Sequence, residues 1–120
     1  LVLRRAVHHS ERITPDLLDR FRGEIGASGA RRAFLNFTRC LNNRDLTSIA
    51  DDLSRIRVPV LIVRGERDVY LSPEISARLH REISSSRLVS VPQAGHFIQL
   101  DEPIVLAEAI HDHTGAVSYG

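Results

Sequence analysis

The feature that most constrains the fold is a pair of short apolar runs in the second half of the chain. The run VPVLIV at 58–63 is nearly continuous and rich in β-branched residues, which is typical of a strand buried on both faces. Pro59 has no N–H to donate to a neighbouring strand, so it belongs at the start of this strand. The serines at 84–86 predict a turn, and RLVSV at 87–91 predicts a second strand.

A helix is predicted after each strand. Ser72 is a typical N-cap followed by Pro73, and the buried stripe then recurs at helical spacing in Ile75, Leu79 and Ile83. Pro103 starts a last helix, which Gly115 can end. This order of elements predicts an α/β fold with two parallel strands and flanking helices. Its right-handed crossover places the carboxyl ends of both strands at one edge of the sheet, where such folds bind ligands.

The first part of the chain, residues 1–56, is predicted to be helical throughout. Thr14 and Pro15 start a first helix whose apolar residues are Leu17, Leu18, Phe21 and Ile25, and GASG at 26–29 breaks it. A second helix begins near Ala30, carries Phe34, Phe37 and Leu41 on one face and ends at NNRD, residues 42–45. A third carries Leu46, Ile49, Leu53 and Ile56.

Composition narrows the classes of function. The net charge of +1 gives no electrostatic basis for a nucleic-acid or membrane partner. The first residues show no signal peptide, and the single Cys40 excludes an internal disulfide or a cysteine-based zinc cluster, so we expect a cytoplasmic location. The sequence contains no methionine, and we therefore expect it to be part of a longer protein.

Two chemically active side chains follow the predicted strands. Asp68 lies in the loop after the first strand, and His96 lies in the loop after the second. Neighbouring strands are only about 4.8 Å apart, so the two loops can bring the carboxylate against the imidazole. Such a carboxylate fixes the histidine tautomer and leaves the other ring nitrogen as a base. From the residues alone His96 could still be a buried structural histidine or a metal ligand, and Asp68 could merely cap its turn.

Two longer stretches resemble the C-terminal part of the α/β-hydrolase fold. They are IRVPVLIVRGERDVYLSPEISARL at 56–79 and LVSVPQAGHFIQLDEPIVLAEAI at 88–110. The shared pattern is a strand after I-x-V-P, a Gly-x-x-Asp turn, a helix, a strand leading to Gly-His, and a Glu-Pro that opens the final helix. The resemblance covers about residues 53–113 and implies that Asp68 is the acid and His96 the base of a catalytic triad. Residues 1–56 would then be the end of a helical cap.

The family's nucleophile elbow has no counterpart in this sequence. The elbow reads Gly-x-Ser-x-Gly, or carries Asp or Cys in place of Ser, and follows a strand. IGASGA at 25–30 has its glycines one residue too close together and follows a predicted helix. The resemblance thus implies a hydrolase of a small ester-like substrate whose nucleophile lies outside this chain, without a cofactor.

The residues also allow two other classes of function. One is a non-catalytic small-molecule receptor or pseudoenzyme of the same fold. An intact nucleophile elbow upstream of Leu1 would argue against this alternative. The other is a bare nucleotide-binding unit, which is disfavoured because no Gly-x-Gly-x-x-Gly follows either strand.

The remaining polar residues receive structural interpretations. HDH at 111–113 does not suit a metal, because helical residues two apart point about 200° apart. His8, His9 and His80 are expected at the surface, and Asp101 and Glu102 at the N-terminus of the last helix. Ser28 is expected in a loop, and Phe34, Phe37 and Phe97 in a core or beneath a cap. Gly65 and Gly95 are expected to adopt backbone conformations that a side chain would hinder.

Three regions are therefore expected: a helical cap segment at 1–56, the C-terminal part of a hydrolase core at 57–115 and a frayed tail at 116–120. The expected partner is a small-molecule substrate. Because an apolar strand with an open edge pairs readily with other chains, the isolated chain is also expected to self-associate.

Overall fold

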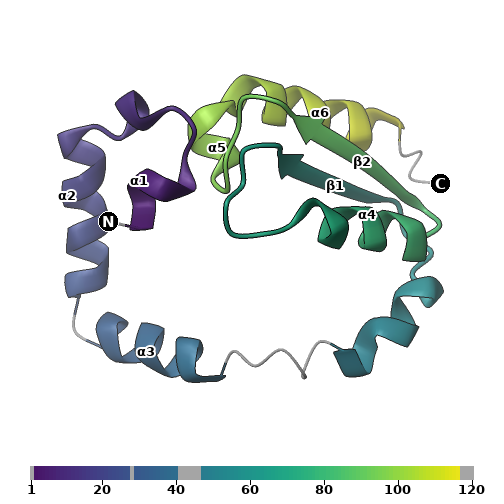
Figure 1. The fold of residues 1–120 in the computed structure, drawn as a ribbon, viewed down its shortest axis with the longest axis horizontal. Helices are drawn as coiled ribbons and strands as arrows, with labels where there is room; N and C mark the ends of the chain where they lie inside the picture. The colour runs from purple at the N-terminus through teal and green to yellow at the C-terminus, as the bar shows by residue number, and fades with distance from the viewer. Residues whose placement is uncertain (1, 28, 41–46, 117–120) are drawn as a thin grey trace. The chain divides into compact units, whose positions relative to one another are not determined.

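The computed structural model describes residues 2–27, 29–40 and 47–116 (Figure 1). The chain divides into two compact units, Leu1–Arg12 with Leu53–Gly120, and Ile13–Asp52. The predictions for Ser28, Leu41, Leu46, residues 42–45 and the tail beyond Ala116 lie outside the described residues. None of the helices within the described ranges is long and apolar enough to cross a membrane.

The unit Ile13–Asp52 contains two α-helices, α2 at Pro15–Gly26 and α3 at Ala30–Cys40. The predicted start of α2 is confirmed, since Thr14 Oγ1 accepts a hydrogen bond of 3.2 Å from the Leu17 N–H. Gly29, between the helices, has a φ of +88°, a conformation that glycine adopts without steric cost, and this explains the break. The third predicted helix is a 3-10 helix, η2 at Thr47–Arg55.

Two parallel strands form the sheet of the other unit, β1 at Val60–Gly65 and β2 at Ser86–Val91. The α/β class and the parallel pairing are thus confirmed. β1 starts two residues later than predicted, where the Val60 N–H donates to the Ser85 carbonyl at 3.1 Å, because Pro59 has no N–H. The register pairs Val60 with Ser86 and Gly65 with Val91, so both strands end at the same level.

Helices α4 at Pro73–Glu82 and α6 at Pro103–Ala116 lie on opposite sides of the two strands (Figure 1). The predicted cap of α4 is confirmed, because Ser72 Oγ accepts the Glu74 N–H at 3.3 Å. α6 continues through Gly115, which was predicted to end it, because this glycine keeps a negative φ. A single-turn helix that the sequence did not predict, α5 at Ile98–Asp101, lies between β2 and α6.

The N-terminal residues belong to the same unit as the sheet. They form α1 at Val2–Ala6 and a single 3-10 turn, η1 at Ser10–Arg12. The hydrophobic core of the unit contains the buried residues Val91, Ala94 and Ile98, with Val63, Val89 and Leu106 packed against them. The core therefore lies where the end of β2 meets α5 and α6.

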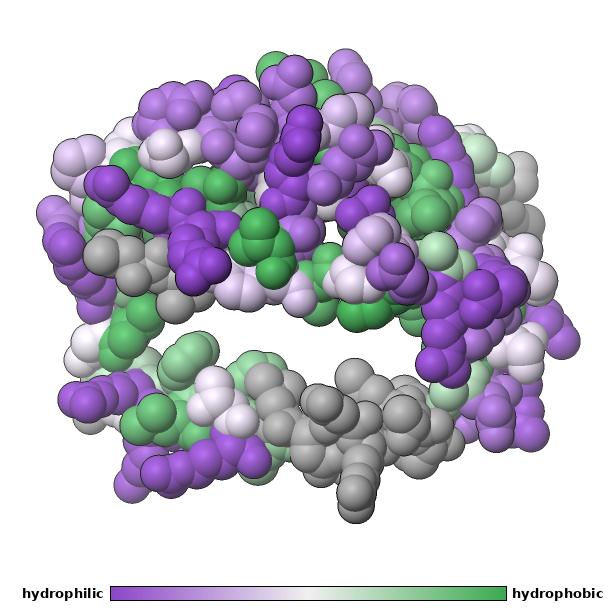
Figure 2. Space-filling model, in the orientation of Figure 1, coloured by the Kyte–Doolittle hydropathy of each residue, from purple (hydrophilic) through white to green (hydrophobic). Residues whose placement is uncertain are grey.

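Apolar surface is exposed in both units. The side chains from Val60 to Arg64 in β1 are half-buried, so the predicted burial of this strand on both faces is wrong for the described chain, whose sheet has two strands. Phe34 and Phe37 of α3 are 61% and 59% exposed. Figure 2 shows several such apolar residues in green between hydrophilic ones.

We expect the isolated chain of 120 residues to self-associate and to unfold without a sharp transition. In the part that the structure describes, β1 pairs with β2 alone, and a strand edge with unpaired backbone groups is a template for other chains. Sedimentation velocity at rising protein concentration and thermal unfolding measure this.

The control is the full-length protein, meaning these residues together with any coding sequence that adjoins them. It should melt cooperatively. A monomer at all concentrations with a sharp transition for the isolated chain would contradict the expectation.

Candidate active site

Asp68 and His96 meet at the edge of the sheet where both strands end. His96 Nδ1 lies 3.0 Å from Asp68 Oδ2, which confirms the predicted proximity of the two side chains. The side chain of Asp68 is 9% exposed and that of His96 is 34% exposed. Because Nδ1 faces a carboxylate, it carries the proton of the neutral ring and leaves Nε2 as the basic atom. Among the described residues none hydrogen-bonds to Nε2.

Asp68 uses its second oxygen to hold its own turn. Oδ1 accepts the N–H groups of Tyr70 at 2.8 Å and Leu71 at 3.1 Å. Burial is the largest influence on the pKa of Asp68 and raises it. The hydrogen bond from His96, together with the weaker effect of the hydrogen bonds from the two backbone amides, lowers the pKa by more than burial raises it. The pKa of Asp68 therefore lies below its ordinary value. Asp68 therefore caps the turn with one oxygen and holds the imidazole with the other.

Backbone contacts join the two loops beyond the ends of the strands. The Glu66 N–H donates to the Val91 carbonyl and the Arg67 N–H to the Ala94 carbonyl, both at 2.9 Å. A Cβ atom on Gly65 would lie 2.2 Å from the carbonyl oxygens of Ala94 and Gly95. A side chain is thus hindered at Gly65, but the cause is the close approach of another backbone and not the special backbone conformation that was predicted.

A pocket of about 190 Å³ lies beside the pair. Its lining includes Asp68 and His96 and is otherwise mainly apolar, with Ile62, Val63, Leu71, Ile75, Leu79 and Ile98. Two aromatic rings meet the imidazole of His96 edge-on, that of Tyr70 at a centroid distance of 5.4 Å and that of Phe97 at 5.3 Å. Sequence reasoning missed Tyr70, although its place two residues after Asp68 was the available signal.

Other polar residues of the region have structural contacts. Ser72 and Ser76 border the pocket, but Ser72 caps α4 and the Ser76 hydroxyl donates to the Pro73 carbonyl at 2.9 Å. His80 is exposed, as predicted, and its Nδ1 lies 2.9 Å from Ser86 Oγ. Within the described ranges, no three His, Cys, Asp or Glu side chains gather closely enough to hold a metal ion.

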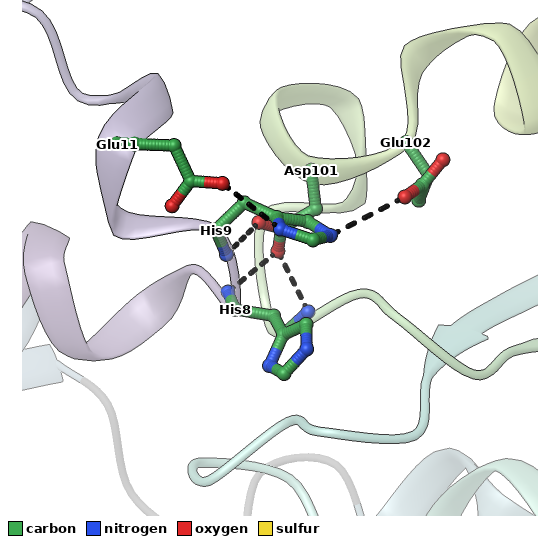
Figure 3. A network of polar contacts seen from close by, with 6 residues as sticks. His8, His9, Glu11, Asp101 and Glu102 are labelled. Atoms are coloured by element: carbon green, nitrogen blue, oxygen red, sulfur yellow. Dashed lines mark hydrogen bonds and ion pairs between the residues drawn. The ribbon is translucent and has the colours of Figure 1, made fainter.

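Asp101 lies just before the last helix, as predicted, but its carboxylate has other partners than the start of that helix. Asp101 ends α5, is 0% exposed, and its carboxylate accepts backbone N–H groups of His8, His9 and Gly95 (Figure 3). The reasoning from the helix dipole missed this because two of the three donors lie at the other end of the sequence.

The predicted surface position of His9 is also wrong. Its side chain is 23% exposed, with Nδ1 at 3.2 Å from Glu11 Oε1 and Nε2 at 3.4 Å from Glu102 Oε1 (Figure 3). This half-buried ring therefore lies between two carboxylates, one near each end of the chain.

The fold and the site together define a hydrolase-like core, and a comparison with protein families agrees. The model of the alpha/beta hydrolase family matches residues 2–109. The chain belongs to the alpha/beta hydrolase family.

Two curated relatives are hydrolases by name. The chain is 28% identical over 110 residues to the uncharacterized hydrolase YugF of Bacillus subtilis. This alignment covers 92% of this chain and 39% of that protein. It is 31% identical over 67 residues to the esterase Rv0045c of Mycobacterium tuberculosis, over 55% of this chain and 22% of that protein. The chain thus spans well under half the length of these relatives.

Two solved structures share the fold. A serine hydrolase involved in carbazole degradation superposes with a TM-score of 0.84 at 16% identity, over 97% of this chain and 45% of that chain. A protein described as an N-acyl homoserine lactone degrading enzyme has a TM-score of 0.70 at 28% identity, over 96% and 44%. Both similarities extend over nearly all of this chain.

The stability of the full-length protein should fall more steeply in acid for the wild type than for Asp68→Asn. The pKa of Asp68 is lowered on folding, so its charge stabilises the fold fully above the ordinary value of 3.8 and loses this effect as the pH falls through the lower folded value. The loss of unfolding free energy on acidification should be roughly 1–2 kcal/mol larger for the wild type than for Asp68→Asn.

Urea unfolding between about pH 6 and about pH 2 measures this difference. Asp112→Asn, on an exposed position of α6, is the matched control and should follow the wild type. Identical pH dependence of the wild type and Asp68→Asn would contradict the expectation.

Gly65→Ala should destabilise the full-length protein by roughly 1–3 kcal/mol or more, because the new Cβ would overlap two backbone carbonyl oxygens. The NMR signals of the His96 imidazole should also shift in Gly65→Ala, because the carbonyls that the new Cβ would meet belong to the loop that carries His96. Gly115→Ala is the control: its Cβ would meet nothing within 4 Å, and stability should be unchanged or higher. Equal stability of the two variants would show that the loops separate easily.

Proposed function

We propose that Asp68 and His96 are the acid and the base of a nucleophile–His–Asp triad, and that the protein hydrolyses an ester or a related bond in a small substrate. The observation that carries this proposal is the 3.0 Å hydrogen bond from His96 Nδ1 to Asp68 Oδ2, on an imidazole that remains 34% exposed. Membership of the alpha/beta hydrolase family supports this proposal.

Each side chain has a defined part in this proposal. His96 Nε2 takes the proton of the attacking group and later gives it to the leaving group. The Asp68 carboxylate keeps the proton of the neutral ring on Nδ1 and stabilises the imidazolium that forms when Nε2 is protonated. Because the pKa of Asp68 is lowered, this carboxylate is charged at neutral pH, as the part requires. Asp68 does not accept the proton itself.

The nucleophile is proposed to lie in sequence outside this chain. The two serines that border the pocket, Ser72 and Ser76, are engaged in the first turn of α4. The stretch IGASGA follows helix α2 and not a strand, unlike a nucleophile elbow. The chain also covers only 39% of YugF, so most of such a relative has no counterpart here.

The class of bond rests on the names of the relatives. One is an esterase, and another is described as degrading an N-acyl homoserine lactone, which is a cyclic ester. The same attack on a carbonyl carbon serves both, and it needs a base placed like His96. The exposed Phe34 and Phe37 lie in the unit Ile13–Asp52, most of the segment 1–56 that is proposed as a helical cap.

His96→Ala in the full-length protein should lower the turnover of a p-nitrophenyl ester by a factor on the order of 10⁴, because the proton then has no acceptor. Asp68→Ala should cost clearly less, since it removes orientation and charge stabilisation but leaves the base. Initial rates at saturating ester measure both.

His111→Ala, on the exposed face of α6, is the control and should retain wild-type turnover. Wild-type turnover by His96→Ala would show that the histidine is structural. A protein that binds small esters without turning them over would favour the alternative of a receptor with this fold.

A further inference from the structure

We propose that Asp101 is a positioning residue for His96: its carboxylate gathers the backbone amides of Gly95, His8 and His9 and so fastens the His96 loop to residues 6–9. This inference deepens the proposed function and rests on it. It concerns a residue that touches neither Asp68 nor the imidazole in the contacts described above, and that therefore acts through the backbone.

The geometry around Asp101 is that of a filled anion site. Oδ2 accepts the N–H of Gly95 at 2.7 Å and that of His8 at 2.9 Å, while Oδ1 accepts the N–H of His9 at 2.7 Å (Figure 3). The residue is 0% exposed. A buried carboxylate is costly unless its charge is hydrogen-bonded, and three amide donors meet that need. Asp101 is therefore tied to three points of the backbone at once.

The backbone of His96 is held on both sides. On one side, the Gly95 N–H is bound by Asp101. On the other side, the Phe97 N–H donates to the Ala6 carbonyl at 3.0 Å. Residues 6–9 thus form a support behind the loop, and Asp101 binds both the loop and the support.

The contact between the loop and this support is tight. A Cβ atom on Gly95 would lie 2.8 Å from the Ala6 carbonyl oxygen and 3.2 Å from the His8 nitrogen. Within the support, the His9 ring lies close to the carboxylates of Glu11 and Glu102. A small loss of attachment at Asp101 would consequently move Gly95 away from residues 6–9 and carry His96 with it.

Such a movement matters for the proposed reaction. The Asp68 carboxylate is oriented within its own turn by the amides of Tyr70 and Leu71. The imidazole must reach that carboxylate with Nδ1 and the reacting group with Nε2 at the same time. A misplacement of about 1 Å can cost about 100-fold in rate, while the binding of substrate is less affected.

The test uses Asp101→Asn in the full-length protein, because this change keeps the shape, removes the charge and places an N–H₂ group against amide donors. We expect kcat for a p-nitrophenyl ester to fall by about 10- to 100-fold and KM to stay within about twofold. The control is Ala109→Gly, which weakens helix α6 at a buried position without touching a polar group of the loop. Its kcat should stay within about twofold of the wild type when both variants are assayed well below their melting temperatures.

The outcomes separate this inference from the proposed function. Loss of kcat in Asp101→Asn but not in Ala109→Gly supports positioning. Equal effects in the two variants, or none in Asp101→Asn, overturn it while the loss of turnover in His96→Ala still stands. If His96→Ala retains turnover, the proposed function itself has failed.

A second measurement applies even if Asp101→Asn does not fold. In Asp68→Asn protein, where the other carboxylate of the site is absent, NMR follows the amides of His8, His9 and Gly95 and the imidazole of His96 as the pH falls. We expect slow hydrogen exchange at the three amides. When the Asp101 carboxylate takes up a proton, the signals of the three amides should shift in one common step, and the His96 signals should shift in the same step. Fast exchange at these amides, or a step that leaves His96 unmoved, would overturn the inference.

Discussion

The parallel pairing of β1 and β2 is the constraint on which the site depends. Because Gly65 stands opposite Val91, the chain leaves both strands at the same level. The bonds from Glu66 to Val91 and from Arg67 to Ala94 then continue the pairing into the loops. In an antiparallel pair the two loops would leave opposite ends of the sheet, and Asp68 could not reach His96. The crossover through α4 is thus what makes a carboxylate and an imidazole neighbours.

Within that frame Asp68 is oriented before it meets the imidazole. Its Oδ1 atom is fixed by the Tyr70 and Leu71 amides of its own turn, and these contacts are local in sequence. The carboxylate is thus oriented by its own turn through one oxygen, while the other oxygen is bonded to the His96 ring. Groups that are ordered in advance in this way stabilise charge without rearranging when it forms. In the proposed triad, the structural and the catalytic roles of Asp68 are two uses of one side chain.

The local and periodic signals of the sequence predicted much of this arrangement, and the long-range contacts escaped it. Thr14, Ser72 and the β-branched run at 58–63 act through neighbours in the chain, so their caps and strand could be predicted. The pairing of Asp68 with His96 followed from topology, since parallel strands share an edge. Asp101 could not be placed by such rules, because the donors at His8 and His9 are more than ninety positions away and carry no pattern. The continuation of helix α6 past Gly115 depends on a backbone angle that the sequence leaves open.

The two carboxylates of this region differ in what their surroundings let them do. For both Asp68 and Asp101, burial raises the pKa and hydrogen bonds to the charged form outweigh it. Asp101 is 0% exposed and its oxygens are taken by backbone amides, so its charge is fixed to a framework that does not change in a reaction. Asp68 keeps one oxygen on an imidazole, a partner that can become charged. A charge that appears on His96 is therefore felt by Asp68 as a stronger hydrogen bond, whereas Asp101 can only determine where the ring stands. In the proposed triad, the same residue type thus supplies a response at one place and rigidity at the other, and the proposed base needs both.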